Sequence, residues 1–153
     1  MQPNKYLQLQ SVCFVFRVIF QAAFVFLLAG YAVSWIAVMT GYTAFSFSLQ
    51  YFALSFFVTV CTLAIIFFLI KLFLSYEKNI FFTAGNATLI KRAGVLLLAQ
   101  QIVTPIWRAI LSGQWPSISF YRIEMIVLAL VIILNGWLTV EAYKIRQDQD
   151  LTI

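Results

Sequence analysis

The sequence predicts an all-α integral membrane protein, a bundle of four transmembrane helices in a single domain that covers residues 1–153. Composition is the first reason, because the 153 residues are 63% hydrophobic and 10% charged and their mean hydropathy is +0.97. A soluble domain has roughly a quarter charged residues. The second reason is that separate segments are long and apolar enough to cross a lipid bilayer. The third is that the basic residues gather on one side of these segments, which predicts cytosolic N and C termini.

The predicted spans are residues 12–39, 50–74, 93–111 and 122–143. A helix needs ~20 residues to cross ~30 Å of hydrocarbon, so the third span is barely long enough and the first has residues to spare. All-round apolarity favours helices, because lone strands in lipid would leave backbone groups unpaired. The first span is also longer than the apolar core of a signal peptide, so we expect an uncleaved anchor.

Lysine and arginine set the predicted orientation. All of the ten basic residues except Arg108 and Arg122 lie near the N-terminus, around the loop at 75–92, or in the tail at 144–153. Basic residues are retained on the cytosolic side of a membrane, so both termini and the central loop are expected there. The same rule accounts for the net charge of +5, and no direct binding to nucleic acid is expected.

The central loop, 75–92, interrupts the apolar chain with charges and turn formers. Asn79 suits a left-handed turn residue, and Thr83 is the expected N-cap of a helix that runs without a break into the third span. Lys91 and Arg92 then lie at headgroup level, where anionic lipid attracts them. Two interpretations follow: a linker with lipid anchors, or a docking surface for a soluble partner.

The loop and the C-terminus together resemble a family, domain of unknown function family 2975. In the loop, YEKNIFFTAGNATLIKRAG, the matching residues are Tyr76, Phe82, Thr83, Asn86, Arg92 and Gly94. In the tail, EAYKIRQDQDLTI, they are Asp148, Asp150, Leu151, Thr152 and Ile153. Asn79 stands where the family usually has Gly, and Ala84–Gly85 replaces a common acidic pair, which predicts a weaker helix start.

The resemblance implies a small, uncharacterised, multi-pass protein of the bacterial cytoplasmic (inner) membrane, often encoded beside a small helix-turn-helix regulator. It implies no activity. Because Asp148 and Asp150 carry the sign opposite to Lys78 and Arg92, we also predict that the tail folds back onto the central loop. The alternative is a tail that stays in solvent.

Polar residues within the spans are costly in lipid and therefore each requires an explanation. Arg17 and Gln21 are four residues apart and share one face of the first span. Glu141 lies at a similar depth in the fourth span, so Arg17 would pair with it if the two spans are neighbours. Otherwise both charges reach separately to the headgroups. In the third span, Gln100 and Gln101 either bond across helices or line a path for a small substrate.

The chain offers little for catalysis, so we expect a non-enzymatic protein without a cofactor or a metal. It has no histidine to act as a base or as a metal ligand. Glu124 and Glu141 are ~25 Å apart along one helix, which is too far for a carboxylate dyad. Cys13 and Cys61 lie at different depths and do not predict a disulfide.

The leading functional prediction is an interaction or regulatory role, in which residues 76–92 and 148–153 contact a soluble partner such as the helix-turn-helix regulator. The alternative is a transporter or channel-like homo-oligomer that passes a small molecule along the intramembrane polar residues Arg17, Gln21, Gln100 and Gln101. A third prediction is a sensor of bilayer state, with Phe81 and Phe82 as the reporting residues.

Overall fold

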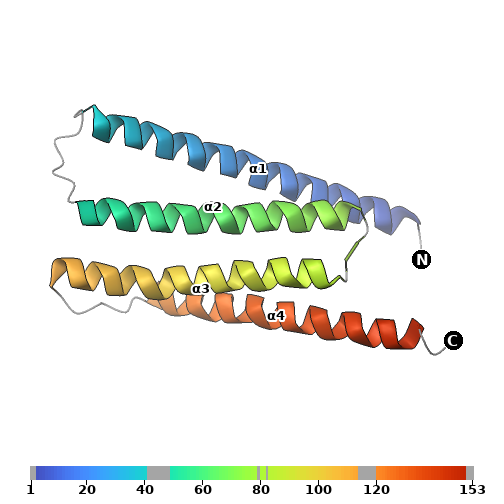
Figure 1. Cartoon of the computed structure of the whole chain (residues 1–153). Helices are drawn as coiled ribbons and strands as arrows, with labels where there is room; N and C mark the ends of the chain where they lie inside the picture. Colours follow the sequence, from blue (N-terminus) through green and yellow to red (C-terminus); the bar gives the residue numbers. More distant parts are fainter. Residues whose placement is uncertain (1–2, 41–48, 79, 82, 114–119, 151–153) are drawn as a thin grey trace.

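Four antiparallel helices make up the computed structural model, which describes residues 3–40, 49–78, 80–81, 83–113 and 120–150. The helices are α1 (Pro3–Met39), α2 (Leu49–Glu77), α3 (Ala84–Ser112) and α4 (Phe120–Asp150), with no strand among the described residues. The two ends of the chain and the α2–α3 connection lie at one end of the molecule (Figure 1), which we call the hairpin end. The predicted all-α architecture is confirmed.

All four helices are long and apolar enough to cross a membrane, which fits a multi-pass membrane protein. The shortest, α2 and α3, have 29 residues each. At 1.5 Å of rise per residue they are ~44 Å long, more than the ~30 Å of a hydrocarbon core. The helices therefore extend beyond the predicted spans. The central loop in particular shrinks from 75–92 to 78–83, because the polar residues on either side of it continue the helices.

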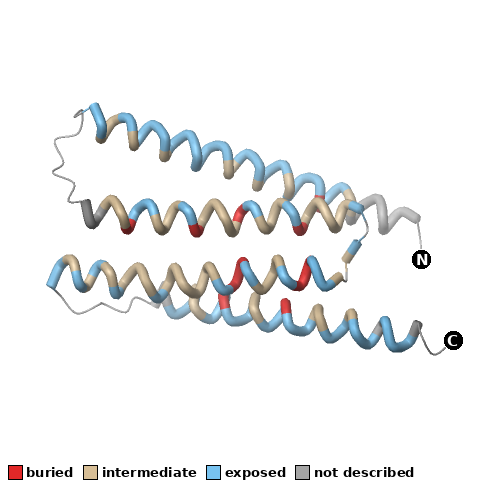
Figure 2. The backbone as a smooth tube through the Cα atoms, in the orientation of Figure 1, coloured by how far each residue is buried: buried red, intermediate tan, exposed pale blue. Residues whose placement is uncertain are grey.

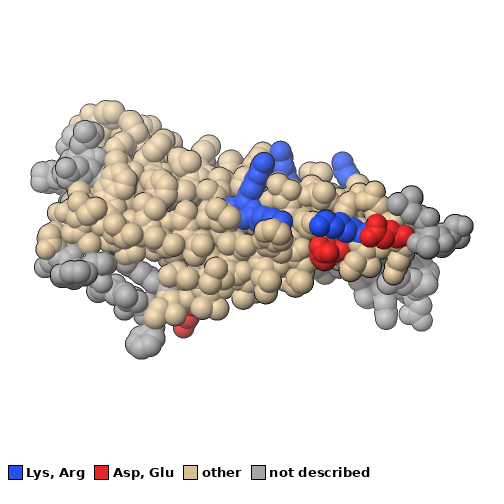
Figure 3. Space-filling model, turned by 60° about the horizontal axis from the view of Figure 1, so that its bottom comes forward, with Lys and Arg blue, Asp and Glu red and all other residues tan. Residues whose placement is uncertain are grey.

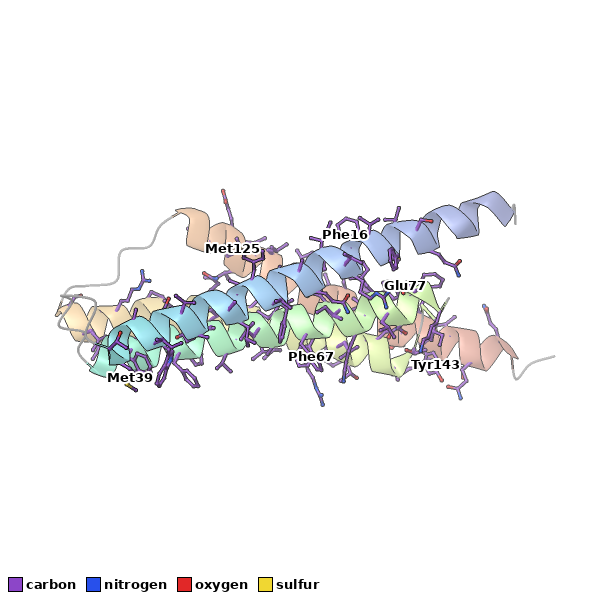
Figure 4. All side chains as sticks on the ribbon, turned by 90° about the horizontal axis from the view of Figure 1, so that it is seen from above. Phe16, Met39, Phe67, Glu77, Met125 and Tyr143 are labelled. Atoms are coloured by element: carbon purple, nitrogen blue, oxygen red, sulfur yellow. The ribbon has the colours of Figure 1, made fainter. Side chains whose placement is uncertain are left out.

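The helices pack in series, each against the next in the chain. Contacts join α1 to α2, α2 to α3 and α3 to α4, and within the described residues α1 does not touch α4. Seen from above, α4 crosses the other helices instead of closing the arrangement against α1 (Figure 4). The predicted bundle is thus an open layer, and the neighbouring first and fourth spans that an Arg17–Glu141 pair requires are not found.

Small residues allow α3 and α4 to approach closely. Gly94, Ala87 and Gly136 are all buried. A Cβ atom built on Gly94 would lie 2.7 Å from Cγ1 of Ile133, and one built on Gly136 would lie 2.6 Å from Cγ of Lys91 and 3.1 Å from its backbone nitrogen. Close contact through small residues is a common way for helices to associate where lipid removes the hydrophobic driving force.

The buried residues are few and lie along the inner faces of the helices, whereas α1 is exposed along most of its length (Figure 2). The outward surface is apolar, with Phe26 81% and Ile110 76% exposed. Exposing side chains of this size to water costs ~1.5–3 kcal/mol each compared with burying them. In hydrocarbon that cost disappears, so the same surface fits a lipid environment.

Candidate functional site

In the α2–α3 connector, residues 78–83, the described residues Ile80 and Phe81 are held by the side chain of Asn86. This residue is only 4% exposed. Its amide nitrogen donates to the backbone carbonyl of Ile80 at 2.6 Å and to that of Phe81 at 3.1 Å. An Asn amide has two N–H donors, and both are used here to satisfy carbonyls that the turn would otherwise leave unpaired. Asn86 therefore anchors Ile80 and Phe81 from inside the first turn of α3.

Two hydroxyl residues complete the turn. The backbone N–H of Ile80 donates to the carbonyl of Ser75 at 3.1 Å, and the Ser75 hydroxyl donates back to the carbonyl of Ile80 at 3.1 Å. Thr83 has extended backbone angles (φ −133°, ψ 152°), and its Oγ1 accepts the N–H of Asn86 at 3.2 Å. This is the geometry of an N-cap, so the predicted capping role of Thr83 is confirmed despite the missing acidic pair.

A row of aromatic rings ties the connector to α1. The ring centroid of Tyr76 lies 5.3 Å from that of Phe81 and 6.3 Å from that of Phe73. Phe73 in turn stacks on Phe16 at 5.5 Å and on Phe20 at 5.7 Å. These separations fall in the favourable range for aromatic pairs. A displacement of Phe81 would therefore disturb the ring contacts that lead to the N-terminal half of α1.

An ion pair between α1 and α2 strengthens the same junction. Nε of Arg17 lies 3.0 Å from Oε1 of Glu77, and the two side chains are 23% and 19% exposed. The backbone carbonyl of Glu77 also accepts a hydrogen bond from the Gln10 side chain at 3.2 Å. Figure 4 shows Glu77 at the hairpin end of α2, beside the N-terminal half of α1.

The partner of Arg17 corrects a prediction. Glu141 does not pair with Arg17; it lies 3.4 Å from Lys144 on the exposed surface of α4. The physical reason is the serial packing, which keeps α1 and α4 apart. In the sequence, Glu77 lies within the polar stretch 75–92, where it resembles a loop residue. A charged residue one turn beyond an apolar run, at the depth of an arginine in the preceding span, is the signal that would have identified it.

Only some of the family-motif residues lie at the connector, and the other described ones lie further along α3 and α4. Tyr76, Thr83 and Asn86 converge on the connector and shape it, so Asn86 is buried and inaccessible to a partner. Gly94 faces Ile133 of α4, whereas Arg92 and Asp148 are exposed. Outside the described residues lie Asn79, Phe82, Leu151, Thr152 and Ile153, and for Asp150 only the backbone is described.

The C-terminal tail does not fold back over its described length. Helix α4 continues without a break through Asp150, and it extends past the start of α3 at the hairpin end (Figure 1). Residues 144–150 therefore do not fold back onto the central loop, and the rest of the predicted fold-back, at 151–153, lies outside the described residues. The helix persists because nothing in KIRQDQD breaks it: this stretch has no Gly or Pro, and Lys, Arg and Gln are good helix formers.

The predicted intramembrane polar residues do not form one path. The Gln100 side chain donates to the Thr62 hydroxyl at 3.4 Å and so links α3 to α2. Gln21 is exposed on α1, which does not contact α3 within the described residues, and Gln101 is half-buried. The Thr104 hydroxyl, one turn beyond Gln100, is buried and makes no hydrogen bond with the described residues. The predicted interhelical role is confirmed for Gln100.

Groups suited to catalysis are not brought together in the described part of the chain. There, no group of three His, Cys, Asp or Glu residues is placed to hold a metal ion, and Cys13 and Cys61 are free and buried. Comparison of the sequence and the fold with protein-family models, curated proteins and solved structures finds no match. The resemblance to family 2975 therefore stays a prediction.

Proposed function

We propose that this chain is a multi-pass protein of the bacterial cytoplasmic membrane that acts, without catalysis, by binding a soluble partner at its hairpin end. Both termini and the 78–83 connector then lie in the cytosol. The distribution of charge along the helices supports this placement. Charge-free runs cover 18–39, 49–70, 93–107 and 125–140, which correspond to ~22–33 Å of helix, close to the hydrocarbon thickness once flanking side chains reach outward.

The hydrogen bonds of the described connector residues support the proposal. The buried Asn86 amide bonds the carbonyls of Ile80 and Phe81, and Thr83 caps the helix that follows. The connector presents Lys78 and Ile80, the latter 45% exposed. A preorganised surface loses less conformational entropy when a partner binds, so a hydrogen-bonded segment of this kind suits recognition.

The surroundings of the connector supply further contact surface. The first turns of α1 and the last turns of α4 extend past it (Figure 1), and α4 carries the exposed Lys144 and Asp148 there. A partner at this end would meet a short apolar segment with charges of both signs around it. That composition suits a protein surface better than nucleic acid. The resemblance to family 2975 makes a small helix-turn-helix regulator the first partner to test.

The test is capture of the partner from cells that express the tagged chain from its own locus. Ile80→Asp places a charge on the apolar segment without touching the Asn86 bonds, and Thr40→Asp makes a matched change at the opposite end, where Thr40 is also exposed. We expect Ile80→Asp to abolish co-purification of the regulator and Thr40→Asp to leave it unchanged. Equal capture by both variants would contradict the proposal.

Transport by a homo-oligomer is the alternative. Two polar features favour it: the Gln100–Thr62 bond between α3 and α2, and the buried Thr104 hydroxyl one turn along α3, which makes no hydrogen bond with the described residues. Gln100→Leu would then abolish solute flux in proteoliposomes, and Ile80→Asp would not change it. If partner binding is the function, Gln100→Leu should affect stability alone and leave capture of the partner intact.

A further inference from the structure

Three cations of α2 and α3 lie inward from the connector, with Lys71 and Arg92 exposed and Lys91 partly exposed beside α4. We define the basic patch as Lys71, Lys91 and Arg92. Leu72 of α2 and Leu89 and Ala93 of α3 line the same interhelical cleft, so the patch residues beside them in sequence are at one height on the two helices. Figure 3 shows basic side chains gathered over this part of the molecule, while the acidic ones lie towards the two ends of α4.

Two of the patch cations, Lys71 and Lys91, contact aromatic rings. Nζ of Lys71 lies 4.7 Å from the ring centroid of Phe67, and Nζ of Lys91 lies 3.9 Å from that of Trp137. Contacts of this kind orient a cation without neutralising its charge. Elsewhere, Arg17 pairs with Glu77 and Lys144 pairs with Glu141. The patch therefore keeps its positive charge available.

Apolar surface continues directly from the patch towards the opposite end of the helices. Phe67 and Val95 are 45% and 53% exposed, and Trp137 is 62% exposed. From Glu77 back to Lys71, and from Ala84 forward to Arg92, the helices rise ~9–12 Å. The patch therefore lies that far from the connector along the helices, at the edge of the apolar surface that faces the hairpin end. A ligand here meets cations at one level with the Trp137 ring beside them, and the apolar side chains of Phe67 and Val95 about one helical turn further from the connector.

We propose that the basic patch is a binding site for an anionic phospholipid. The phosphate would lie among Lys71, Lys91 and Arg92, and the acyl chains would run along Phe67, Val95 and Trp137. Clustered cations next to a membrane attract anionic lipid, and the exposed apolar wall explains why the ligand is a lipid and not a soluble anion. A nucleic acid would need the cations on a solvated surface, without an apolar wall beneath them.

The test uses the full-length chain purified in detergent and titrated with phosphatidylglycerol or phosphatidylcholine at low ionic strength, with bound lipid counted by native mass spectrometry. We expect tighter binding of phosphatidylglycerol. Each cation contributes about fivefold, so Lys71→Gln with Arg92→Gln should weaken phosphatidylglycerol binding about 25-fold and leave phosphatidylcholine unchanged. The matched control is Lys144→Gln, which removes a cation already paired with Glu141; it should change binding less than about twofold.

Three results would overturn the proposal. The first is equal binding of the two lipids by the wild type, and the second is an equal effect of the patch variant and of Lys144→Gln. The third is full displacement of phosphatidylglycerol by millimolar glycerol phosphate, which would identify an anion site without a contribution from the acyl chains. Because Lys71 and Arg92 are exposed, the variant should keep the wild-type thermal unfolding in phosphatidylcholine, which separates lost binding from lost folding. Lys91→Arg should preserve lipid selectivity, since it keeps the charge.

Discussion

The close crossing of α3 and α4 gives a stability prediction that can be worked out from single atoms. In Gly136→Ala, the new Cβ would lie 2.6 Å from Cγ of Lys91, 3.1 Å from its backbone nitrogen and 3.3 Å from the carbonyl oxygen of Ala87. In Gly94→Ala it would lie 2.7 Å from Cγ1 and 3.1 Å from the backbone nitrogen of Ile133. The Lys91 side chain can move aside, but the backbone atoms can withdraw only if the two helices separate. Overpacking of this kind typically costs ~1–3 kcal/mol.

Gly30→Ala is the matched control, because nothing lies within 4 Å of a Cβ at that position. The higher helix propensity of alanine, ~1 kcal/mol over glycine, is gained at all three positions and cancels in the comparison. We therefore expect the free energy of unfolding of Gly94→Ala and of Gly136→Ala to be ~1–3 kcal/mol lower than that of Gly30→Ala. The assay is reversible unfolding in mixed micelles of increasing SDS content, followed by circular dichroism. If all three variants unfold together, the close approach of α3 and α4 is wrong.

Two further predictions concern the hairpin end and use the same unfolding assay. Asn86→Ala removes both bonds to the connector and leaves two carbonyls unpaired, so it should lower the free energy of unfolding by ~2–4 kcal/mol. The control, Thr88→Ala, removes an exposed hydroxyl from the same helix and should lower it by under ~0.5 kcal/mol. Similar losses in the two variants would exclude the structural role of Asn86. For the largely buried ion pair, Arg17→Met or Glu77→Met alone should cost ~2–4 kcal/mol, less than a fully buried pair because each side chain keeps some exposure, and the double variant should recover most of this loss. Additive losses would mean that the two charges do not interact.

The helical class and the number of apolar segments follow from composition, because a chain this poor in charge cannot cover itself with polar surface in water. The N-cap is also predictable from the sequence, since a Thr at the junction between a turn and a helical segment has a local chemical role. The residues at which the helices end are harder to predict. Lys78 and Arg92 are both basic residues beside an apolar run, yet one lies in the connector and the other in α3. The hydrogen bonds made by Ser75, Thr83 and Asn86 set the helix ends between them.

The pairing of Arg17 could not be predicted, because it depends on which helices are neighbours. An open layer and a closed bundle use the same apolar segments, and the choice is made by side-chain packing such as Gly94 against Ile133. Hydropathy carries no information on that packing. The role of the motif residue Asn86 could not be predicted for a similar reason. Its hydrogen-bond acceptors are the backbone carbonyls of Ile80 and Phe81, and backbone groups leave no pattern in the sequence.

The side of the membrane on which the hairpin end lies in living cells can be measured with single cysteines. In a chain with Cys13 and Cys61 replaced by alanine, Ile80→Cys and Thr40→Cys place single thiols at opposite ends of the molecule. A membrane-impermeant maleimide applied to intact spheroplasts should label position 40 and spare position 80, and inverted vesicles should give the opposite pattern. Labelling of position 80 from outside, or of both positions from the same side, would contradict a chain that crosses the membrane four times with its hairpin end in the cytosol.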